Sequence, residues 1–86
     1  MFQIINQPVS VIAKYDHELK KTVPVKFKWN GSVYQITKLG FYHNYKNGTH
    51  LFHVFEGVTP SFFFRLILDS QTLHWKLEQI SNGETN

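Results

Sequence analysis

The pair Asn30-Gly31 constrains the fold of this chain more than any other feature of its sequence. Asn-Gly suits a two-residue hairpin turn, because both central positions of that turn need a positive φ angle. Such a turn pairs Phe27 with Tyr34 and places Trp29 on the same face of the hairpin. Turn chemistry and the alternation of apolar side chains therefore predict the same register, which favours a β-hairpin.

The rest of the chain alternates in the same way, with turn residues about every ten positions. A second Asn-Gly, Asn47-Gly48, predicts another two-residue turn that pairs Tyr45 with His50, and it leaves one long strand over 32–46. The switch of apolar parity at Gly40 predicts a bulge or bend within that strand. A third hairpin joins 61–68 to 73–80. We predict a single all-β domain over 1–86, a six-stranded antiparallel meander that is a strongly bent sheet or a small barrel. Its ordered part is 8–80, and 81–86 is expected to be a flexible tail.

The inward-facing positions of the first and third hairpins predict the hydrophobic core. The third hairpin pairs Leu66 with Trp75 and puts Arg65 directly opposite Lys76 on the outer face. The expected core residues are Phe27, Trp29, Tyr34, Phe64, Leu66, Trp75 and Leu77.

Composition excludes several classes of protein. The absence of cysteine among 86 residues excludes disulfide scaffolds, thiolate nucleophiles and zinc sites built on Cys. A hydrophobic content of 42% against 17% charged residues is too apolar for intrinsic disorder. No segment resembles a signal peptide or is long and apolar enough to span a membrane, so we expect a cytoplasmic chain with no membrane partner.

The histidines and carboxylates predict no enzyme and no cofactor. His43 and His50 share a face in the expected register and are the only weak candidates for metal ligands, since no carboxylate is expected near them. No two carboxylates are placed for paired acid–base chemistry, and glycine-rich phosphate loops and nucleophile elbows are missing. Strand-surface histidines beside aromatic rings are the simpler interpretation.

Basic side chains on the non-core faces suggest an anionic partner. A β surface that carries both basic and aromatic side chains is a common way to hold single-stranded nucleic acid. The alternative is that these lysines keep the outer faces soluble or protect an edge strand, and the net charge of +3 is mild. The candidate residues for nucleic-acid or anion binding are Lys26, Lys28, Arg65, His74 and Lys76.

The chain also resembles a known family in its aromatic and turn positions. The motif residues are Pro24, Phe27, Trp29, Gly31, Tyr34 and Ile36, then Phe52 and Val54, then Phe64, Leu66 and Asp69, and finally Trp75 and Leu77. In this spacing they resemble a family of small bacterial all-β domains of unknown function. The resemblance implies a short stand-alone protein, in some members encoded beside genes of lesion-bypass DNA polymerases, and it carries over no catalytic residue. His53 departs from the pattern, because relatives often have Arg there.

Three functions follow as hypotheses. The favoured one is a small non-enzymatic binding module whose partner is a protein or a nucleic acid. The first alternative is a structural domain that forms homo-oligomers such as a homodimer, because aromatic side chains on both faces of the strands can leave an exposed apolar patch. The second alternative is binding of single-stranded nucleic acid linked to DNA repair.

Overall fold

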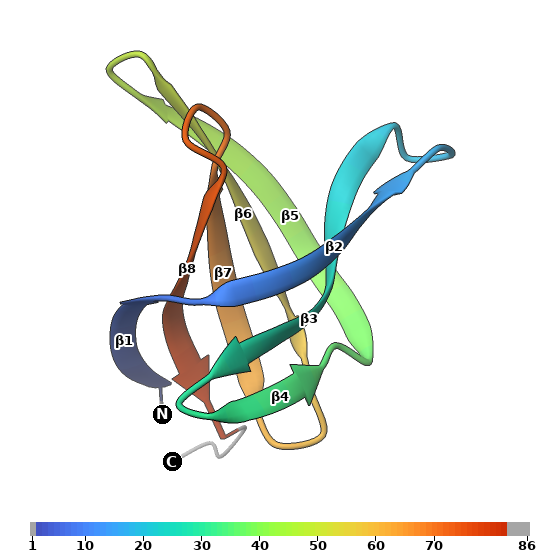
Figure 1. Ribbon diagram of the computed structural model, residues 1–86, viewed down its shortest axis with the longest axis vertical. Helices are drawn as coiled ribbons and strands as arrows, with labels where there is room; N and C mark the ends of the chain where they lie inside the picture. The colour runs from blue at the N-terminus through green and yellow to red at the C-terminus, as the bar shows by residue number, and fades with distance from the viewer. Residues whose placement is uncertain (1, 83–86) are drawn as a thin grey trace.

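The computed structural model describes residues 2–82, and all regular secondary structure in that range is β-strand (Figure 1). The all-β prediction is confirmed, and residues 2–82 contain no helix. The strands are β1 (Phe2–Pro8), β2 (Ser10–Asp16), β3 (Lys21–Trp29), β4 (Ser32–Gln35), β5 (Lys38–Asn47), β6 (His50–Val58), β7 (Phe63–Asp69) and β8 (His74–Ser81).

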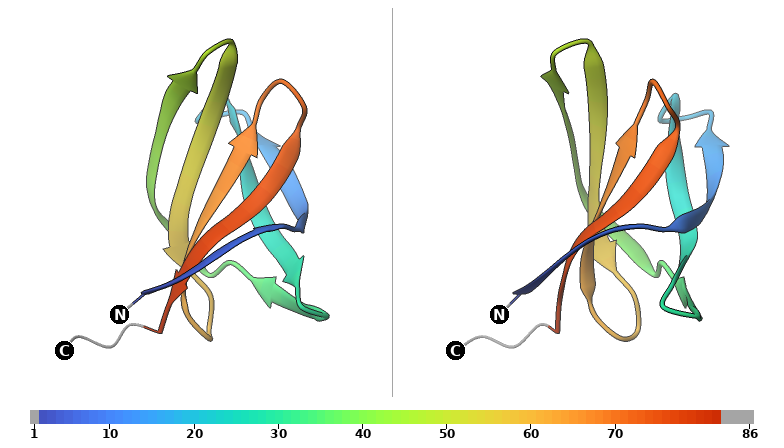
Figure 2. Two further views of the ribbon diagram at one scale, coloured as in Figure 1. Left: turned by 90° about the vertical axis from the view of Figure 1, so that its left-hand side faces the viewer. Right: turned by 60° about the vertical axis from the view of Figure 1, so that its left-hand side comes forward.

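These strands form two antiparallel sheets rather than the predicted six-stranded meander. The five-stranded sheet has the order β1-β8-β7-β6-β5, and the three-stranded sheet has the order β2-β3-β4. The smaller sheet packs across one face of the larger one (Figure 2). Among residues 2–82 no strand pairing joins the two sheets, so they do not close into a barrel.

The chain passes from the five-stranded sheet to the three-stranded sheet between β1 and β2, and it returns at a sharp corner between β4 and β5. The amide of Ile36 donates to the carbonyl of Val25 in the three-stranded sheet at 3.0 Å, and the next amide, Thr37, donates to Val58 in the five-stranded sheet at 2.9 Å. The single strand predicted over 32–46 is therefore wrong, because it divides at this corner. Gly40 does lie at a register shift between Leu39 and Phe41, which confirms the bulge.

The hairpin at Asn30-Gly31 has the predicted register. Phe27 pairs with Tyr34, and the φ angles of Asn30 and Gly31 are 56° and 83°. Both angles lie in the left-handed region that this turn requires and that Asn and Gly tolerate. Local sequence is sufficient to determine this part of the fold.

The other two hairpins predicted from the sequence, β5–β6 and β7–β8, form with registers that differ by two residues from the prediction. In β5–β6 the turn is Gly48-Thr49, with Tyr45 opposite Phe52, because the turn places Gly at its first central position, with a φ of 65°. In β7–β8 a four-residue turn, 70–73, puts Leu66 opposite Leu77. A shift of two preserves the faces of the side chains, in β8 as far as the bulge at Glu78, so the alternating pattern is equally consistent with both registers.

The ordered region also begins and ends at other residues than predicted. β1 is a strand that the prediction leaves out; it pairs with β8 through a register shift between Ile4 and Gln7. Its Gln7 side chain accepts a hydrogen bond from the indole N–H of Trp29 at 3.0 Å, which links the two sheets. Ser81 belongs to β8 rather than to a tail, Asn82 directly follows that strand, and the other residues of the predicted tail, 83–86, lie outside the described residues.

The core lies between the two sheets. Four side chains form its fully enclosed centre: Phe27, Phe64, Leu66 and Leu77. The other expected core residues, Trp29, Tyr34 and Trp75, pack against this centre and are only partly buried. The rings of Phe27 from β3 and Phe64 from β7 lie 5.4 Å apart at their centroids, so each sheet contributes to the same cluster.

Candidate interaction surface

The face of the five-stranded sheet that points away from the core is the most unusual surface of the described chain. We call it the outer face. Strand register and alternation place the following side chains on it: Phe41, His43 and Tyr45 from β5; His50, Phe52, Val54, Glu56 and Val58 from β6; Phe63, Arg65, Ile67 and Asp69 from β7; and His74 and Lys76 from β8.

The outer face is apolar at its centre although no described element covers it. Val54 and Ile67 are opposite each other on β6 and β7, and they are only 2% and 5% exposed. Around them Phe41, Tyr45 and Phe63 are large and exposed, with Phe63 at 52%. Neighbouring side chains of the face already enclose Val54 and Ile67, and it is the exposed aromatic residues on the same face that are typical of an interaction site.

Aromatic rings are ordered along the β5–β6 part of the outer face. The ring of Phe52 stacks on Tyr45 with centroids 5.1 Å apart, and on His50 with centroids 5.9 Å apart. Further along β5, Phe41 and His43 lie 5.3 Å apart. Such contacts limit the rotamers of exposed rings, so less side-chain entropy is lost when a partner binds.

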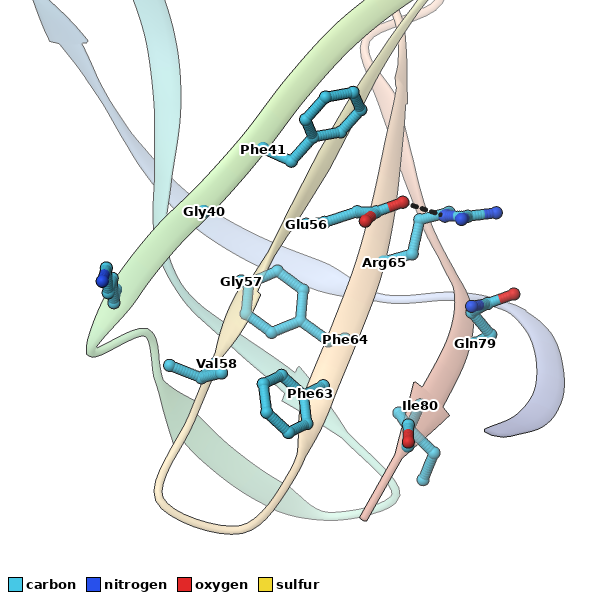
Figure 3. A pocket seen from close by; sticks show the side chains of 12 residues that line it. Gly40, Phe41, Glu56, Gly57, Val58, Phe63, Phe64, Arg65, Gln79 and Ile80 are labelled. Atoms are coloured by element: carbon cyan, nitrogen blue, oxygen red, sulfur yellow. Dashed lines mark hydrogen bonds and ion pairs between the residues drawn. The ribbon is translucent and has the colours of Figure 1, made fainter. Parts of the chain in front are cut away.

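A shallow pocket of about 340 Å³ lies at the end of the outer face near the β6–β7 turn (Figure 3). Phe41 and Phe63 flank it, and the backbone of Gly40 and Gly57 contributes to its lining. The Glu56–Arg65 ion pair borders it on the side nearer the centre of the sheet. The pocket has the size of one or two side chains of a partner.

The charges of the outer face neutralise one another. Arg65 Nε donates to Glu56 at 2.7 Å, and its Nη1 donates to Glu78 at 3.0 Å. Partial burial acts to lower the pKa of Arg65, but the hydrogen bonds to Glu78 and Glu56 outweigh it, and the pKa is raised. Arg65 is therefore a permanent cation that two carboxylates already satisfy.

The predicted pairing of Arg65 with Lys76 is wrong. Lys76 lies opposite Ile67, and Arg65 lies opposite Gln79. The displacement follows from the register of β7–β8. Glu78 is the extra residue of a bulge in β8, and its carboxylate pairs with Arg65. Arg65 and Lys76 are therefore not two like charges in a direct pair, and their positions give no reason to expect a bound anion between them.

The five predicted anion-binding residues do not form one surface. Arg65, His74 and Lys76 lie on the outer face of the larger sheet. Lys26 and Lys28 pair with Gln35 and Val33 on the outward side of the three-stranded sheet. Because the two sheets pack through their inner faces, these two groups point in opposite directions.

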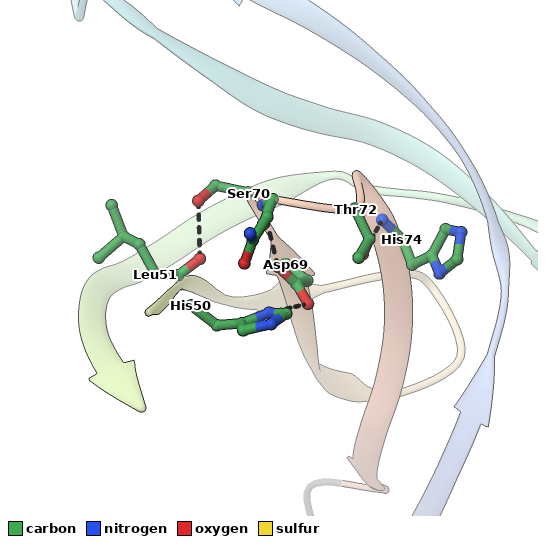
Figure 4. A network of polar contacts seen from close by, with 7 residues as sticks. His50, Leu51, Asp69, Ser70, Thr72 and His74 are labelled. Carbon is green, nitrogen blue, oxygen red and sulfur yellow. Dashed lines mark hydrogen bonds and ion pairs between the residues drawn. The ribbon is translucent and has the colours of Figure 1, made fainter. Parts of the chain in front are cut away.

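His50 is part of a polar network that joins the β5–β6 turn to the β7–β8 turn (Figure 4). Its Nδ1 lies 2.8 Å from Asp69 Oδ2, and the hydroxyl of Ser70 donates to the carbonyl of Leu51 at 2.8 Å. The expectation that no carboxylate lies near this patch is wrong, because β7 pairs with β6 and brings Asp69 there.

The structure does not bring the two candidate metal ligands together. His43 and His50 are on the same face, as predicted, but they lie opposite Val54 and Asn47 respectively, several positions apart along β5–β6. Within residues 2–82 no three His, Asp or Glu side chains are arranged to hold a metal ion.

Asp69 makes the stability of this network depend on pH. Partial burial acts to raise the pKa of Asp69, but the amide of Gln71 and the side chain of His50 hydrogen-bond to its carboxylate, and the pKa is lowered. A carboxylate with a lowered folded-state pKa stabilises the fold above its unfolded pKa of about 3.9, and this contribution is lost as pH falls through the folded value.

We therefore expect Asp69→Asn to flatten the acid side of the stability profile. The melting temperature of the wild type should fall more steeply than that of the variant as pH is lowered from about 5 to about 2. Thermal unfolding followed by circular dichroism measures both curves. Parallel curves for the two proteins would show that Asp69 is not held as an ion by this network.

Phe41, Tyr45 and Phe52 are not singled out by the sequence as residues of one surface. The sequence does contain one signal of this surface. Every second residue over 41–45 and over 50–52 is aromatic or histidine, and these two segments are on adjacent strands. The same strands also carry apolar residues at the opposite parity, such as Tyr42 and Phe55, and so the pattern does not distinguish the covered face from the uncovered one.

Comparison of the chain with protein-family models, with curated proteins and with solved structures found no match. The resemblance to small bacterial all-β domains therefore stays a prediction. Among the described residues, no helix is long and apolar enough to cross a membrane.

Proposed function

We propose that this protein is a small non-enzymatic binding module and that it binds another protein through the outer face of the five-stranded sheet. The observation that carries the proposal is the exposure of three large aromatic side chains, Phe41, Tyr45 and Phe63, on a face that no described element covers. Aromatic side chains that are exposed in the free protein commonly serve as anchors of partner-binding surfaces.

Charge supports a protein partner over a nucleic acid on this face. Three basic side chains, Lys38, Arg65 and Lys76, share the face or its rim with three carboxylates. Those carboxylates are Glu56, Asp69 and Glu78. Binding of single-stranded nucleic acid gains most of its affinity from basic side chains that neutralise phosphates, and this face has no net excess of them.

A crosslinking residue on the outer face tests the proposal. We would replace Phe63 with the photo-reactive analogue p-benzoylphenylalanine and irradiate the cells that make the protein. The matched control carries the analogue at Val33, which is 57% exposed on the outward side of the three-stranded sheet. We expect a discrete protein adduct from position 63 only, and adducts of the same mass from both positions, or from neither, would contradict the proposal.

Phe63→Ala then measures what the surface contributes. Because Phe63 is exposed, we expect its loss to change the free energy of unfolding by no more than about 0.5 kcal/mol. The affinity for the crosslinked partner, measured by calorimetry, should fall about thirtyfold, which corresponds to about 2 kcal/mol for an aromatic anchor. Unchanged affinity would place the contact elsewhere.

The nucleic-acid alternative makes a different prediction. An oligonucleotide would have to meet Lys26 and Lys28 on the outward side of the three-stranded sheet, where Ile12 and Val33 are also exposed. Titration of a single-stranded oligonucleotide at low salt distinguishes the two partners. Binding that Lys26→Ala weakens and Phe63→Ala does not would favour nucleic acid.

A further inference from the structure

Two sheets that do not close leave four edge strands in the described chain, β1, β2, β4 and β5. An edge strand exposes unpaired backbone N–H and C=O groups, and proteins usually prevent association there with short strands, bulges, prolines or charges. β4 has only four residues, and β1 has a register shift after Ile4 and ends at Pro8. β2 has a register shift after Ile12 and carries Lys14 and Asp16.

β5 lacks most of these protections. It is ten residues long, contains no proline and has one register shift, near its start at Gly40. Its only Lys, Arg, Asp or Glu residues are Lys38 and Lys46, one at or near each end. From Phe41 to Asn47 it pairs regularly with β6 and forms the outer border of the sheet (Figure 1).

The inner side of β5 is already occupied by the chain itself. The Nζ of Lys21 lies 3.7 Å from the centroid of the Tyr42 ring, and the hydroxyl of Tyr42 hydrogen-bonds to Nδ1 of His53. The first contact joins β5 to β3 of the other sheet, and the second joins it to β6 of its own sheet. No described strand pairs with the free edge of β5, and so the backbone groups that point away from β6 are available for another strand.

We propose that β5 pairs antiparallel with β5 of a second copy of this chain, about a two-fold axis that passes through His43. This pairing joins the two five-stranded sheets into one continuous ten-stranded sheet. An isologous contact of this kind closes as a dimer, because each copy uses its single β5 edge. This proposal is separate from the proposed binding of another protein to the outer face. In the dimer the outer faces of the two copies would lie side by side on one continuous surface.

The side chains of β5 favour this register. Phe41 would lie opposite Tyr45 of the partner subunit and Tyr45 opposite Phe41 of the partner subunit, which makes two aromatic cross-strand pairs on the outer face. Lys46 would lie opposite Gly40 of the partner subunit, which has no side chain and no charge. An axis through Tyr42 instead would put Phe41 opposite His43 of the partner subunit, and both pairs of Phe41 with Tyr45 would be lost.

The length of the contact indicates a weak, reversible dimer. Strand pairing over about seven residues per copy buries less surface than the roughly 1,600 Å² of a standard stable interface. We therefore expect the monomer to predominate in dilute solution and the dimer at high concentration. Sedimentation equilibrium between about 10 μM and about 1 mM should give a mass that rises from 10.1 kDa towards twice that value. A mass that stays at 10.1 kDa over the whole range would overturn the proposal.

A charge exchange at His43 tests which surface is used. His43 is exposed, and its ring contacts Phe41 on its own strand, so we expect His43→Lys and His43→Glu to fold. In either variant alone, two like charges face each other across the axis, and the dissociation constant should rise about fivefold or more. An equimolar mixture of the two should restore dimerisation, because the charges are then opposite.

The control is Val33→Lys, which adds a charge to β4, the edge strand at the far end of the three-stranded sheet. We expect it to leave the dissociation constant unchanged. Dimerisation that both His43 variants leave unaffected, or that Val33→Lys weakens equally, would show that another surface is used and would overturn the proposal.

Discussion

Replacing Phe27 with alanine is expected to lower the free energy of unfolding by about 3–5 kcal/mol. Phe27 is 1% exposed, and its ring contacts Tyr34 on β4 and Phe64 on β7, with centroids 5.5 Å and 5.4 Å away. It therefore joins the two sheets, and its removal leaves a cavity that neither sheet can fill without moving. Small domains have only about 5–15 kcal/mol of total stability, so the variant should be close to unfolding.

Urea denaturation measures this loss, with Val33→Ala as the control from the same sheet. Val33 faces outward, and its truncation should change the free energy of unfolding by about 0.5 kcal/mol or less. A loss of under about 1 kcal/mol for Phe27→Ala would show that the sheets do not pack through this residue. Trp75, also expected in the core, is only partly buried, so we expect a smaller loss for Trp75→Ala.

Gly57→Ala is expected to lower the free energy of unfolding by about 2–3 kcal/mol, the upper part of the range for overpacked cores. A Cβ at this position would overlap the backbone carbonyl oxygen of Lys38 on β5 and lie 3.1 Å from Cζ of Phe64. The carbonyl cannot rotate away as a side chain can, and so β5 would have to separate locally from β6. Loss of amide protection in β5, measured by hydrogen exchange, should accompany the loss of stability.

Gly40→Ala is the matched control, since Gly40 lies in the neighbouring strand near Gly57. The atom nearest to the methyl group that alanine would add at Gly40 is the carbonyl oxygen of Glu56, 3.9 Å away, which is an ordinary contact distance. Alanine there should leave stability unchanged or raise it by up to about 1 kcal/mol through the unfolded state. Equal losses for the two variants would rule out the close approach at Gly57 as the cause.

Local signals in the sequence predict much of this fold. Asn30-Gly31 determines both the turn and the register of β3–β4, because the required φ angles are a property of those two residues. The change of apolar parity at Gly40 locates a bulge for the same local reason. For the other hairpins, alternation determines the face of each side chain but permits a shift of two residues, and the structure takes that shift in both.

The candidate surface is less visible in the sequence. The prediction that Lys26, Lys28, Arg65 and Lys76 lie on non-core faces is correct for each residue, since alternation identifies those faces. Alternation does not say to which sheet a strand belongs, and for this reason it groups residues that the fold separates. The contact of His50 with Asp69 likewise depends on β6 lying beside β7.

By itself, then, the sequence determines an all-β chain, the hairpin at Asn30-Gly31, and which side chains of each strand share a face. Only the tertiary structure decides that eight strands divide into two sheets, with the chain crossing between them after β1 and again between Ile36 and Thr37. It alone shows that the face around Val54 and Ile67 stays uncovered by the described chain. The physical reason is range: side-chain alternation and turn geometry act over a few neighbouring residues, whereas the division into two packed sheets depends on contacts between strands far apart in the sequence, such as Phe27 of β3 with Phe64 of β7.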